Sequence, residues 1–276
     1  MNVMENFNLK NNLAIITGGA GLLGKKHIEA LIEAGADVIV FDINTTALEE
    51  VKEYCFEKYQ KEIFILNVDI TKENEIENAK KLIFSKYNKY PDILINNAAI
   101  DPKFEKSSKV NKSRLENFDL NQWNLEISVG LTGAMLCSKI FGYEMANNKK
   151  GVILNIASDL GVIAPDQRLY KQDSLNDDEQ NVKPVTYSVI KHGLVGLTKY
   201  IATYWADKGV RCNAFAPGGV FNNHPDEFLE KITNLIPMNR MARVDEYKSS
   251  ILFLCSDASS YMNGATLNMD GGRSIW

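Results

Sequence analysis

Two side chains with the spacing for proton transfer lie in the second half of the sequence. Tyr187 and Lys191 are four positions apart, and such positions share one face of a helix. A nearby ammonium favours the phenolate and lowers the pKa of a tyrosine, so the phenol can act as a general acid or base on an alcohol or carbonyl. With Ser158 upstream, this is the chemistry of a nicotinamide-dependent oxidoreductase.

The Tyr-x-x-x-Lys spacing does not identify a site by itself. It recurs at 54–58 and 204–208, where a solvated helix face is the simplest interpretation. The choice among the three pairs depends on the order of the other motifs.

A glycine-rich turn near the N-terminus provides a second kind of chemistry. It lies between a predicted strand and a predicted helix, and its sequence is Thr17-Gly18-Gly19-Ala20-Gly21-Leu22-Leu23-Gly24. Glycines let the backbone approach a pyrophosphate, and the helix N-terminus supplies N–H groups and partial positive charge. We therefore expect a dinucleotide to be bound by Gly18, Gly21, Leu22, Leu23 and Gly24.

The second predicted strand ends in an acidic residue, Asp42. A carboxylate at this point accepts hydrogen bonds from the adenosine-ribose hydroxyls and repels a 2′-phosphate. The residues that follow, 43–45, include no arginine to bind that phosphate. The sequence therefore predicts NAD as the cofactor and makes NADP the less favoured alternative.

Short apolar runs alternate with longer amphipathic runs along almost the whole chain. This alternation predicts an α/β, doubly wound Rossmann fold, in which a mostly seven-stranded parallel sheet has helices on both faces. We expect a single domain over 1–276. Strands are predicted at 13–17, 37–41, 63–68, 93–96, 152–156, 210–214 and 266–269. Helices are predicted at 22–34, 46–59, 72–86, 120–146, 185–207 and 244–256.

Two polar segments, 101–119 and 164–184, interrupt this alternation. Both follow predicted strands, and the loops at the carboxyl ends of strands bind ligands in open α/β sheets. We expect them to be substrate loops, with surface loops of no catalytic role as the alternative.

The composition excludes several classes of protein. The net charge is −4 and no basic cluster is present, so nucleic-acid binding is not expected. No apolar stretch approaches membrane-spanning length, and the N-terminus lacks the pattern of a signal peptide. The four cysteines form no metal-binding pattern, and we expect reduced thiols in a cytoplasmic protein. They are Cys55, Cys137, Cys212 and Cys255.

Five motifs follow one another in a fixed order. After the glycine turn come Asn96-Asn97-Ala98-Ala99, then the set of Ser158, Tyr187 and Lys191, then Pro217-Gly218-Gly219-Val220, and last Asp270-Gly271-Gly272. In this order the chain resembles the classical short-chain dehydrogenase/reductase family over nearly its whole length. The pair at 54–58 precedes the serine, and Tyr187 with Lys191 is the first of the two pairs between the serine and the Pro-Gly segment, the place that the family's pattern gives to its catalytic pair.

The resemblance implies a direct hydride transfer between a nicotinamide and the substrate. Tyr187 would exchange a proton with the substrate oxygen, Lys191 would also bind the nicotinamide ribose, and Ser158 would orient the oxygen. By the same resemblance, the residues that contact the cofactor also include Asp69, Ile70, Asn97, Ala98, Ala99, Pro217, Gly218 and Val220.

Three features depart from the family's pattern. Leu22 stands where classical members have a glycine, an inserted segment separates Ser158 from Tyr187, and Gly130 replaces the asparagine of a proton relay. Gly130 either admits another water molecule or frees space for the substrate. It also keeps open the alternative of a cofactor-binding protein without turnover, although the intact catalytic residues favour an enzyme.

The two polar loops, 101–119 and the inserted segment 164–184, indicate a polar substrate. Arg168 is a candidate for binding a phosphate or carboxylate, as are Lys103 and Lys106, and His224 lies just beyond the Pro-Gly segment. Solvated charges are the alternative interpretation. The inserted segment resembles that of dehydrogenases of flagellin and surface-sugar modification, so we expect a sugar, a sugar phosphate or a polyol. A 3-oxoacyl reductase is the alternative.

The predicted helices 120–146 and 185–207 are apolar on more than one face. An apolar second face must be buried somewhere. Together with the resemblance, this predicts a homo-oligomer, specifically a tetramer.

Overall fold

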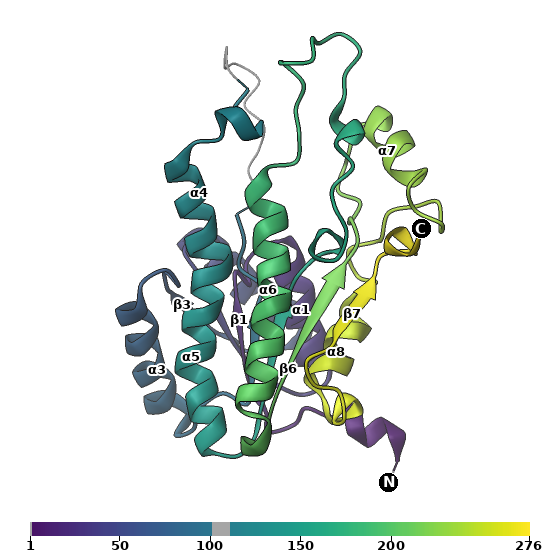
Figure 1. The fold of residues 1–276 in the computed structure, drawn as a ribbon. Coiled ribbons are helices and arrows are strands. Elements are labelled where there is room, and N and C mark those ends of the chain that lie inside the picture. Colours follow the sequence, from purple (N-terminus) through teal and green to yellow (C-terminus); the bar gives the residue numbers. More distant parts are fainter. Residues whose placement is uncertain (1, 101–110) are drawn as a thin grey trace.

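Seven parallel strands form one sheet at the centre of the molecule (Figure 1). The computed structural model describes residues 2–100 and 111–276. The strands are β1 (Leu13–Thr17), β2 (Asp37–Asp42), β3 (Phe64–Asn67), β4 (Ile93–Asn96), β5 (Gly151–Ile156), β6 (Val210–Pro217) and β7 (Thr266–Met269). Their order is β3-β2-β1-β4-β5-β6-β7, which confirms the predicted doubly wound sheet.

Helices cover both faces of the sheet because neighbouring residues of each strand point to opposite sides. Ala14 and Ile16 of β1 belong to one apolar cluster, and Leu13 and Ile15 belong to another. The first cluster is completed by α1 (Leu22–Glu33), α2 (Thr45–Tyr59) and α8 (Lys248–Cys255). The second is completed by α3 (Glu73–Tyr87), α5 (Gly133–Asn147) and α6 (Val185–Tyr204), which lie in front of the sheet in Figure 1.

The predicted helix 120–146 is interrupted in the structure. It consists of α4 (Leu120–Ile127), a π-helical turn (Ser128–Thr132) and α5. The whole segment Leu120–Asn147 is long and apolar enough to span a membrane by length and composition alone, which corrects the expectation that no such stretch exists. Because more than half of the most apolar 18-residue window in this segment is buried inside the protein, the segment is a core helix.

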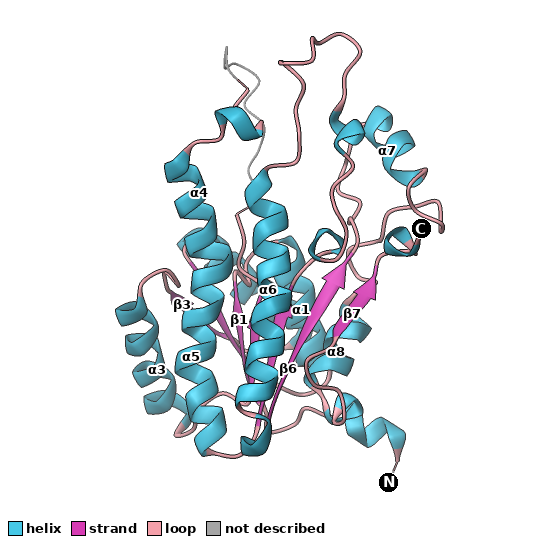
Figure 2. Cartoon of the chain, viewed as in Figure 1, coloured by secondary structure: helices cyan, strands magenta, loops and turns pink. Residues whose placement is uncertain are grey.

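One helix was not predicted from the sequence. It is α7 (Asp226–Thr233), and it packs on a 3₁₀ turn (Gln167–Tyr170) of the inserted segment 164–184. Their shared apolar cluster is Leu169, Ile232, Ile236 and Met241. Beyond its 3₁₀ turn the inserted segment has no regular secondary structure, and it projects past the carboxyl ends of the strands beside α6 (Figure 2). In the other predicted loop, residues 101–110 lie outside the described residues.

Candidate active site

The glycine turn after β1 is shaped by contact with the turn after β4. Gly18 has a φ of +60°, and a Cβ added there would lie 2.7 Å from the Cα of Ala98. The Asn97 side chain donates hydrogen bonds to the carbonyls of Thr17 (3.0 Å) and Gly18 (2.9 Å). In return, Thr17 Oγ1 accepts the backbone N–H groups of Asn97 (3.0 Å) and Ala98 (3.1 Å). These hydrogen bonds therefore fix the glycine turn and the turn after β4, both predicted to contact the cofactor, relative to each other.

These residues fit a dinucleotide. Gly21 is the N-cap of helix α1 and has no side chain that could accept a hydrogen bond from the first turn of the helix. The first backbone N–H groups of α1 therefore remain available to a ligand at the glycine turn. Gly21 and Leu22 are exposed, whereas Gly24 is buried. A Cβ at Gly24 would lie 2.6 Å from the Gly18 carbonyl oxygen, so the turn requires glycine there.

Asp42 lies at the end of β2 beside this turn. Its Oδ2 accepts the Ala20 N–H at 3.2 Å, and its Oδ1 accepts the Asn44 N–H at 3.0 Å. The carboxylate thus connects β2 to the glycine turn in addition to its predicted role toward the ribose.

Asp69 follows β3, and its carboxylate is engaged locally. Burial by itself raises the pKa of Asp69, but hydrogen bonds from the Thr71 hydroxyl (2.7 Å) and N–H (3.0 Å) outweigh it, and the pKa is lowered. Ile70 is buried against Gly133, where an added Cβ would lie 2.6 Å from its Cδ1.

Tyr187 and Lys191 lie on the first turns of α6, as predicted. The Lys191 ammonium is buried, donates to the carbonyl of Ile156 at the end of β5 (2.8 Å) and lies 5.6 Å from the Tyr187 ring centroid. Helix α6 therefore presents both residues toward the carboxyl end of β5, where Ser158 follows.

Ser158 is part of a buried chain of hydrogen bonds that the sequence did not reveal. Its Oγ donates to Asp159 Oδ1 (2.7 Å) and accepts the Leu160 N–H (3.2 Å). Asp159 Oδ2 forms an ion pair with Arg273 at 2.7 Å, and both of these side chains are buried. The only available signal was the position of Arg273 directly after the Asp-Gly-Gly motif.

A second lysine, Lys183, also lies against the predicted catalytic tyrosine. Its Nζ is 3.8 Å from the Tyr187 ring centroid. Like Lys191 it is four residues from Tyr187, but on the N-terminal side, and this spacing could have identified it.

The two proposed substrate-binding residues are engaged elsewhere. Arg168 is exposed and forms a two-pronged ion pair with Asp166, with nitrogen–oxygen distances of 2.9 and 2.6 Å. The His224 ring stacks on Phe228 of α7 (5.2 Å between centroids) and accepts the Asn222 N–H at 3.2 Å. Lys103 and Lys106 lie outside the described residues.

The Pro-Gly segment after β6 is fixed by the C-terminal turn. Gly218 donates its N–H to Met269 and accepts the Tyr247 hydroxyl at 2.9 Å. Val220 bridges to Ala242. Pro217, Gly218 and Val220 thus lie at the carboxyl end of β6, the edge that also carries Ser158 after β5.

Gly130 lies within the π-helical turn and is buried. A Cβ added there would approach Ile190 Cγ2 to 2.8 Å. Ile190 of α6 therefore fills the space that a larger side chain would take. The expectation that Gly130 frees space for the substrate is wrong.

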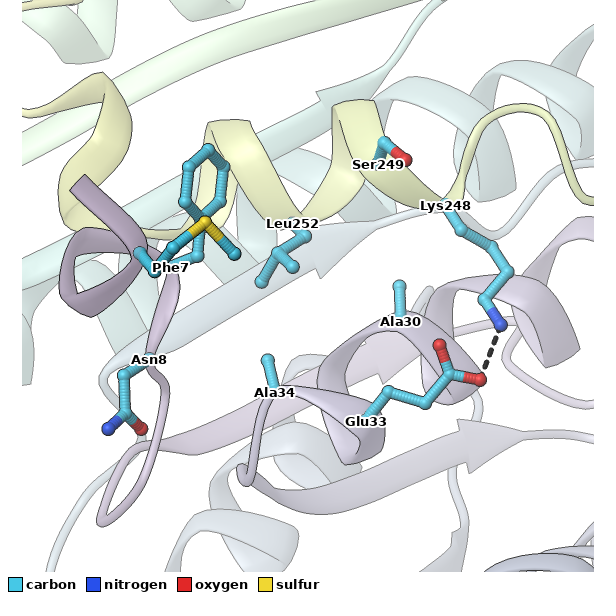
Figure 3. Close-up of a pocket in the computed structure, with 9 residues that line it drawn as sticks. Phe7, Asn8, Ala30, Glu33, Ala34, Lys248, Ser249 and Leu252 are labelled. Atoms are coloured by element: carbon cyan, nitrogen blue, oxygen red, sulfur yellow. Dashed lines mark hydrogen bonds and ion pairs between the residues drawn. The ribbon is translucent and has the colours of Figure 1, made fainter.

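A surface cavity of about 360 Å³ lies away from these residues (Figure 3). It is formed by the N-terminal turn, α1 and α8, and the Glu33–Lys248 ion pair (2.5 Å) closes one side. None of the predicted site residues lines it, so it is not the candidate active site.

Comparisons with known proteins agree with this arrangement. The family described as short chain dehydrogenase matches residues 12–170, and that described as enoyl-(acyl carrier protein) reductase matches residues 174–274. An NAD-dependent glycerol dehydrogenase of Listeria innocua is 31% identical, with 98% of this chain and 97% of the relative covered. A 2-dehydro-3-deoxy-D-gluconate 5-dehydrogenase of Bacillus subtilis is 30% identical, with 97% and 96% covered.

Two further matches bear on the predicted subgroup and on the cofactor. The post-translational flagellin modification protein A of Campylobacter coli is 26% identical over 96% of this chain and 98% of its own. The crystal structure of a short chain dehydrogenase from Leptospira borgpetersenii with bound NAD⁺ has a TM-score of 0.78 and 29% identity, with 100% and 96% covered. Because the first family model covers more than half of the chain, the protein belongs to the short-chain dehydrogenase/reductase family of oxidoreductases.

Proposed function

We propose that the protein is an NAD(H)-dependent oxidoreductase that interconverts a secondary alcohol and a carbonyl on a polar substrate. The observation that carries this proposal is the placement of Tyr187 and Lys191 on one face of α6, with Lys191 bonded to the last residue of β5. Ser158 is the second residue after that strand. The three groups needed for proton transfer and oxygen binding thus meet at one edge of the sheet.

The cofactor, when bound, supplies the hydride chemistry, and the protein supplies position and proton transfer. Tyr187 takes the hydroxyl proton during oxidation and returns it during reduction. The Lys191 ammonium favours the phenolate form of Tyr187, and its bond to Ile156 holds it in place.

Ser158 binds the reacting oxygen. A carboxylate only accepts hydrogen bonds, so the hydroxyl hydrogen of Ser158 points to Asp159. Because the substrate hydroxyl gives its single hydrogen to Tyr187, Ser158 holds the reacting oxygen by turning its own O–H from Asp159 to the substrate, a donor role that serves the alcohol and the carbonyl alike.

Asp42 supports NAD as the cofactor. Its carboxylate lies at the end of β2, beside the glycine turn, where it favours ribose hydroxyls over a phosphate. A relative named for NAD and a family structure holding NAD⁺ support the same choice.

The substrate is proposed to be a sugar, a sugar phosphate or a polyol. The names of two relatives point to polyhydroxylated molecules, glycerol and a deoxygluconate derivative. The inserted segment is polar and supplies the rim of the site, together with α7.

Two further features of the proposal concern the assembly and the compartment. Exposed apolar side chains on α5 and α6 support a homo-oligomer, for which a tetramer is expected. All four cysteines are free and buried, which is consistent with a reducing cytoplasm.

The proposal is tested by following NAD⁺ and NADP⁺ reduction across sugars, sugar acids, sugar phosphates, polyols and hydroxyacyl thioesters. We expect turnover with NAD⁺ and a polyhydroxylated substrate. Turnover confined to the thioesters would favour the 3-oxoacyl reductase alternative. NADH binding without turnover of any compound would favour the non-catalytic alternative.

A further inference from the structure

The buried ion pair of Asp159 and Arg273 lies directly behind the predicted catalytic serine. Arg273 Nη1 is 2.7 Å from Asp159 Oδ2, and the other carboxylate oxygen, Oδ1, accepts the Ser158 hydroxyl at 2.7 Å. Arg273 begins the short C-terminal turn (Arg273–Ile275), which lies beyond the carboxyl end of β7 (Figure 1). One carboxylate therefore separates this arginine from the residue proposed to bind the reacting oxygen.

The backbone around Asp159 also packs against the predicted catalytic lysine. Ser158 is the N-cap of a 3₁₀ turn (Asp159–Gly161), and a Cβ added at Gly161 would lie 2.8 Å from the carbonyl oxygen of Lys191. On the other side of Ser158, the Lys191 ammonium donates to the carbonyl of Ile156. The charge of Asp159 therefore lies close to the groups proposed to transfer the proton, in buried surroundings where charges interact more strongly than in water.

Stability alone does not explain a buried ion pair at this place. Such a pair stabilises a fold no better than apolar side chains of similar volume, because burial removes both charges from water. The acidic member also lies beside an oxygen that becomes negatively charged in the proposed reaction and near a tyrosine that must lose its proton. A carboxylate without a cation would disfavour both of these negative charges.

Charges of both signs surround this part of the site. Lys183 and Lys191 lie against Tyr187, with their ammonium groups 3.8 and 5.6 Å from its ring centroid. Among the described residues, Arg273 is the one cation that forms an ion pair with Asp159. The other titratable side chains near the ion pair, either directly or through Tyr247, are Asp166, Glu246, Tyr247 and Asp270. Three of these four are acidic, so they cannot replace the charge of Arg273.

We propose that Arg273 is a positioning residue of the active site, which neutralises Asp159 behind Ser158 and thereby keeps Tyr187 able to lose its proton. This inference rests on the proposed function, because it takes Tyr187 as the group that exchanges a proton with the substrate. It adds a residue of the C-terminal turn to the residues that determine the proton transfer.

The experiment follows the ionisation of Tyr187 by phenolate absorbance as the pH is raised, in the full-length protein with NADH. The spectrum of a matched Tyr187→Phe protein is subtracted for every variant, so the difference reports Tyr187 alone. The variants are Arg273→Met, Asp159→Asn, the double variant and Arg273→Lys. Lys80→Met is the control, because it breaks a partly buried ion pair with Glu144 (3.3 Å) near the amino end of β5, away from the site.

The two single neutralisations should move the midpoint pH of this titration in opposite directions. Arg273→Met should raise it by at least about half a pH unit, because the charge of Asp159 is then uncompensated and disfavours the phenolate. Asp159→Asn should lower it, because the uncompensated guanidinium favours the phenolate. The double variant, Arg273→Lys and Lys80→Met should stay near the wild type. Loss of stability cannot produce this pattern, since unfolding would move both single variants toward the same ordinary tyrosine value.

Equal midpoints in the wild type and Arg273→Met would overturn the inference. Shifts of the two single variants in the same direction would also overturn it, as would a wild-type Tyr187 that stays protonated until the protein unfolds. Because the titration needs no substrate, this result is separate from failure of the proposed function, which would appear as turnover that survives the loss of the Tyr187 hydroxyl.

Discussion

At the scale of single residues, Asp159 connects the predicted catalytic serine to the C-terminal turn. Its carboxylate accepts from Ser158 on one side and from Arg273 on the other, and 114 positions separate the two ion-pair partners. The motif order predicted Ser158, Tyr187 and Lys191 as the catalytic residues, because the chemistry requires these residue types and places the lysine four positions after the tyrosine. Asp159, Arg273 and Lys183 were not identified, since their roles arise only when distant segments meet.

Arg273→Met is predicted to destabilise the folded protein by about 3–5 kcal/mol, because it leaves the buried Asp159 carboxylate without its partner. Urea unfolding at pH 7 measures this. The double variant Asp159→Asn with Arg273→Met buries no charge and should recover more than half of the loss. If Arg273→Met alone lowers the free energy of unfolding by less than about 1 kcal/mol, the ion pair with Asp159 does not contribute substantially to stability.

At the scale of elements, the contact between the π-helical turn and α6 explains why residue 130 is glycine. Ile190, the residue before Lys191 in α6, lies against Gly130. The size of residue 130 therefore determines how closely α6 approaches the π-helical turn.

Periodicity predicted the strands and most helices, because buried faces leave a regular pattern. It could not reveal the π-helical turn, which changes hydrogen bonding without changing composition. It could have revealed α7, where acidic residues in the first turn precede apolar side chains at 228, 229 and 232.

Gly130→Asn is predicted to cost about 1–3 kcal/mol of unfolding free energy through overlap with Ile190. Gly196→Asn is the matched control, because Gly196 lies in α6 with nothing within 4 Å of an added Cβ. It should cost less than about 0.5 kcal/mol, as surface substitutions usually do. When Ile190 is also replaced by Ala, the loss of unfolding free energy caused by Gly130→Asn should be smaller, because the overlapping side chain is gone. Equal costs for the two glycines would rule out the packing explanation.

At the scale of the whole molecule, folding places a histidine where it cannot take up a proton. His27 of α1 is 1% exposed, and neither ring nitrogen has a hydrogen-bond partner among the described residues. Burial lowers the pKa of His27 from 6.5 to about 3. The unfolded chain therefore binds a proton that the folded protein does not, and stability present above pH 6.5 is lost as the pH falls toward 3.

Between pH 7 and pH 5, the wild type should lose about 2 kcal/mol more stability than His27→Leu. Urea unfolding at the two pH values measures this. The neighbouring Glu29 does not interfere: burial alone would raise its pKa, but hydrogen bonds from Lys26, Tyr54 and Lys248 hold it at about 2. His192→Leu, at an exposed histidine, should keep the wild-type pH dependence. Equal losses of stability between pH 7 and pH 5 in the wild type and in His27→Leu would show that His27 is not the source of the pH dependence.

The outer faces of α5 and α6 bear on the assembly. A groove of about 510 Å³ between them is lined by apolar and aromatic side chains that include Met135, Tyr143, Tyr200 and Tyr204. A second copy of the chain would remove this surface from water. We predict an oligomer by size exclusion with light scattering and a shift to smaller species for Tyr200→Glu with Tyr204→Glu. Tyr261→Glu, at an exposed tyrosine on another surface, should leave the mass unchanged. A monomeric wild type would contradict the prediction.

The role of Tyr187 in proton transfer is tested most directly by NAD⁺ reduction with the wild type and with Tyr187→Phe, with NADH binding measured on both. The variant is expected to bind NADH as the wild type does and to lose about 10²–10⁴-fold in turnover, the contribution of a positioned general acid or base. Turnover within a few-fold of the wild type would contradict it, because proton transfer would then not pass through the hydroxyl of Tyr187.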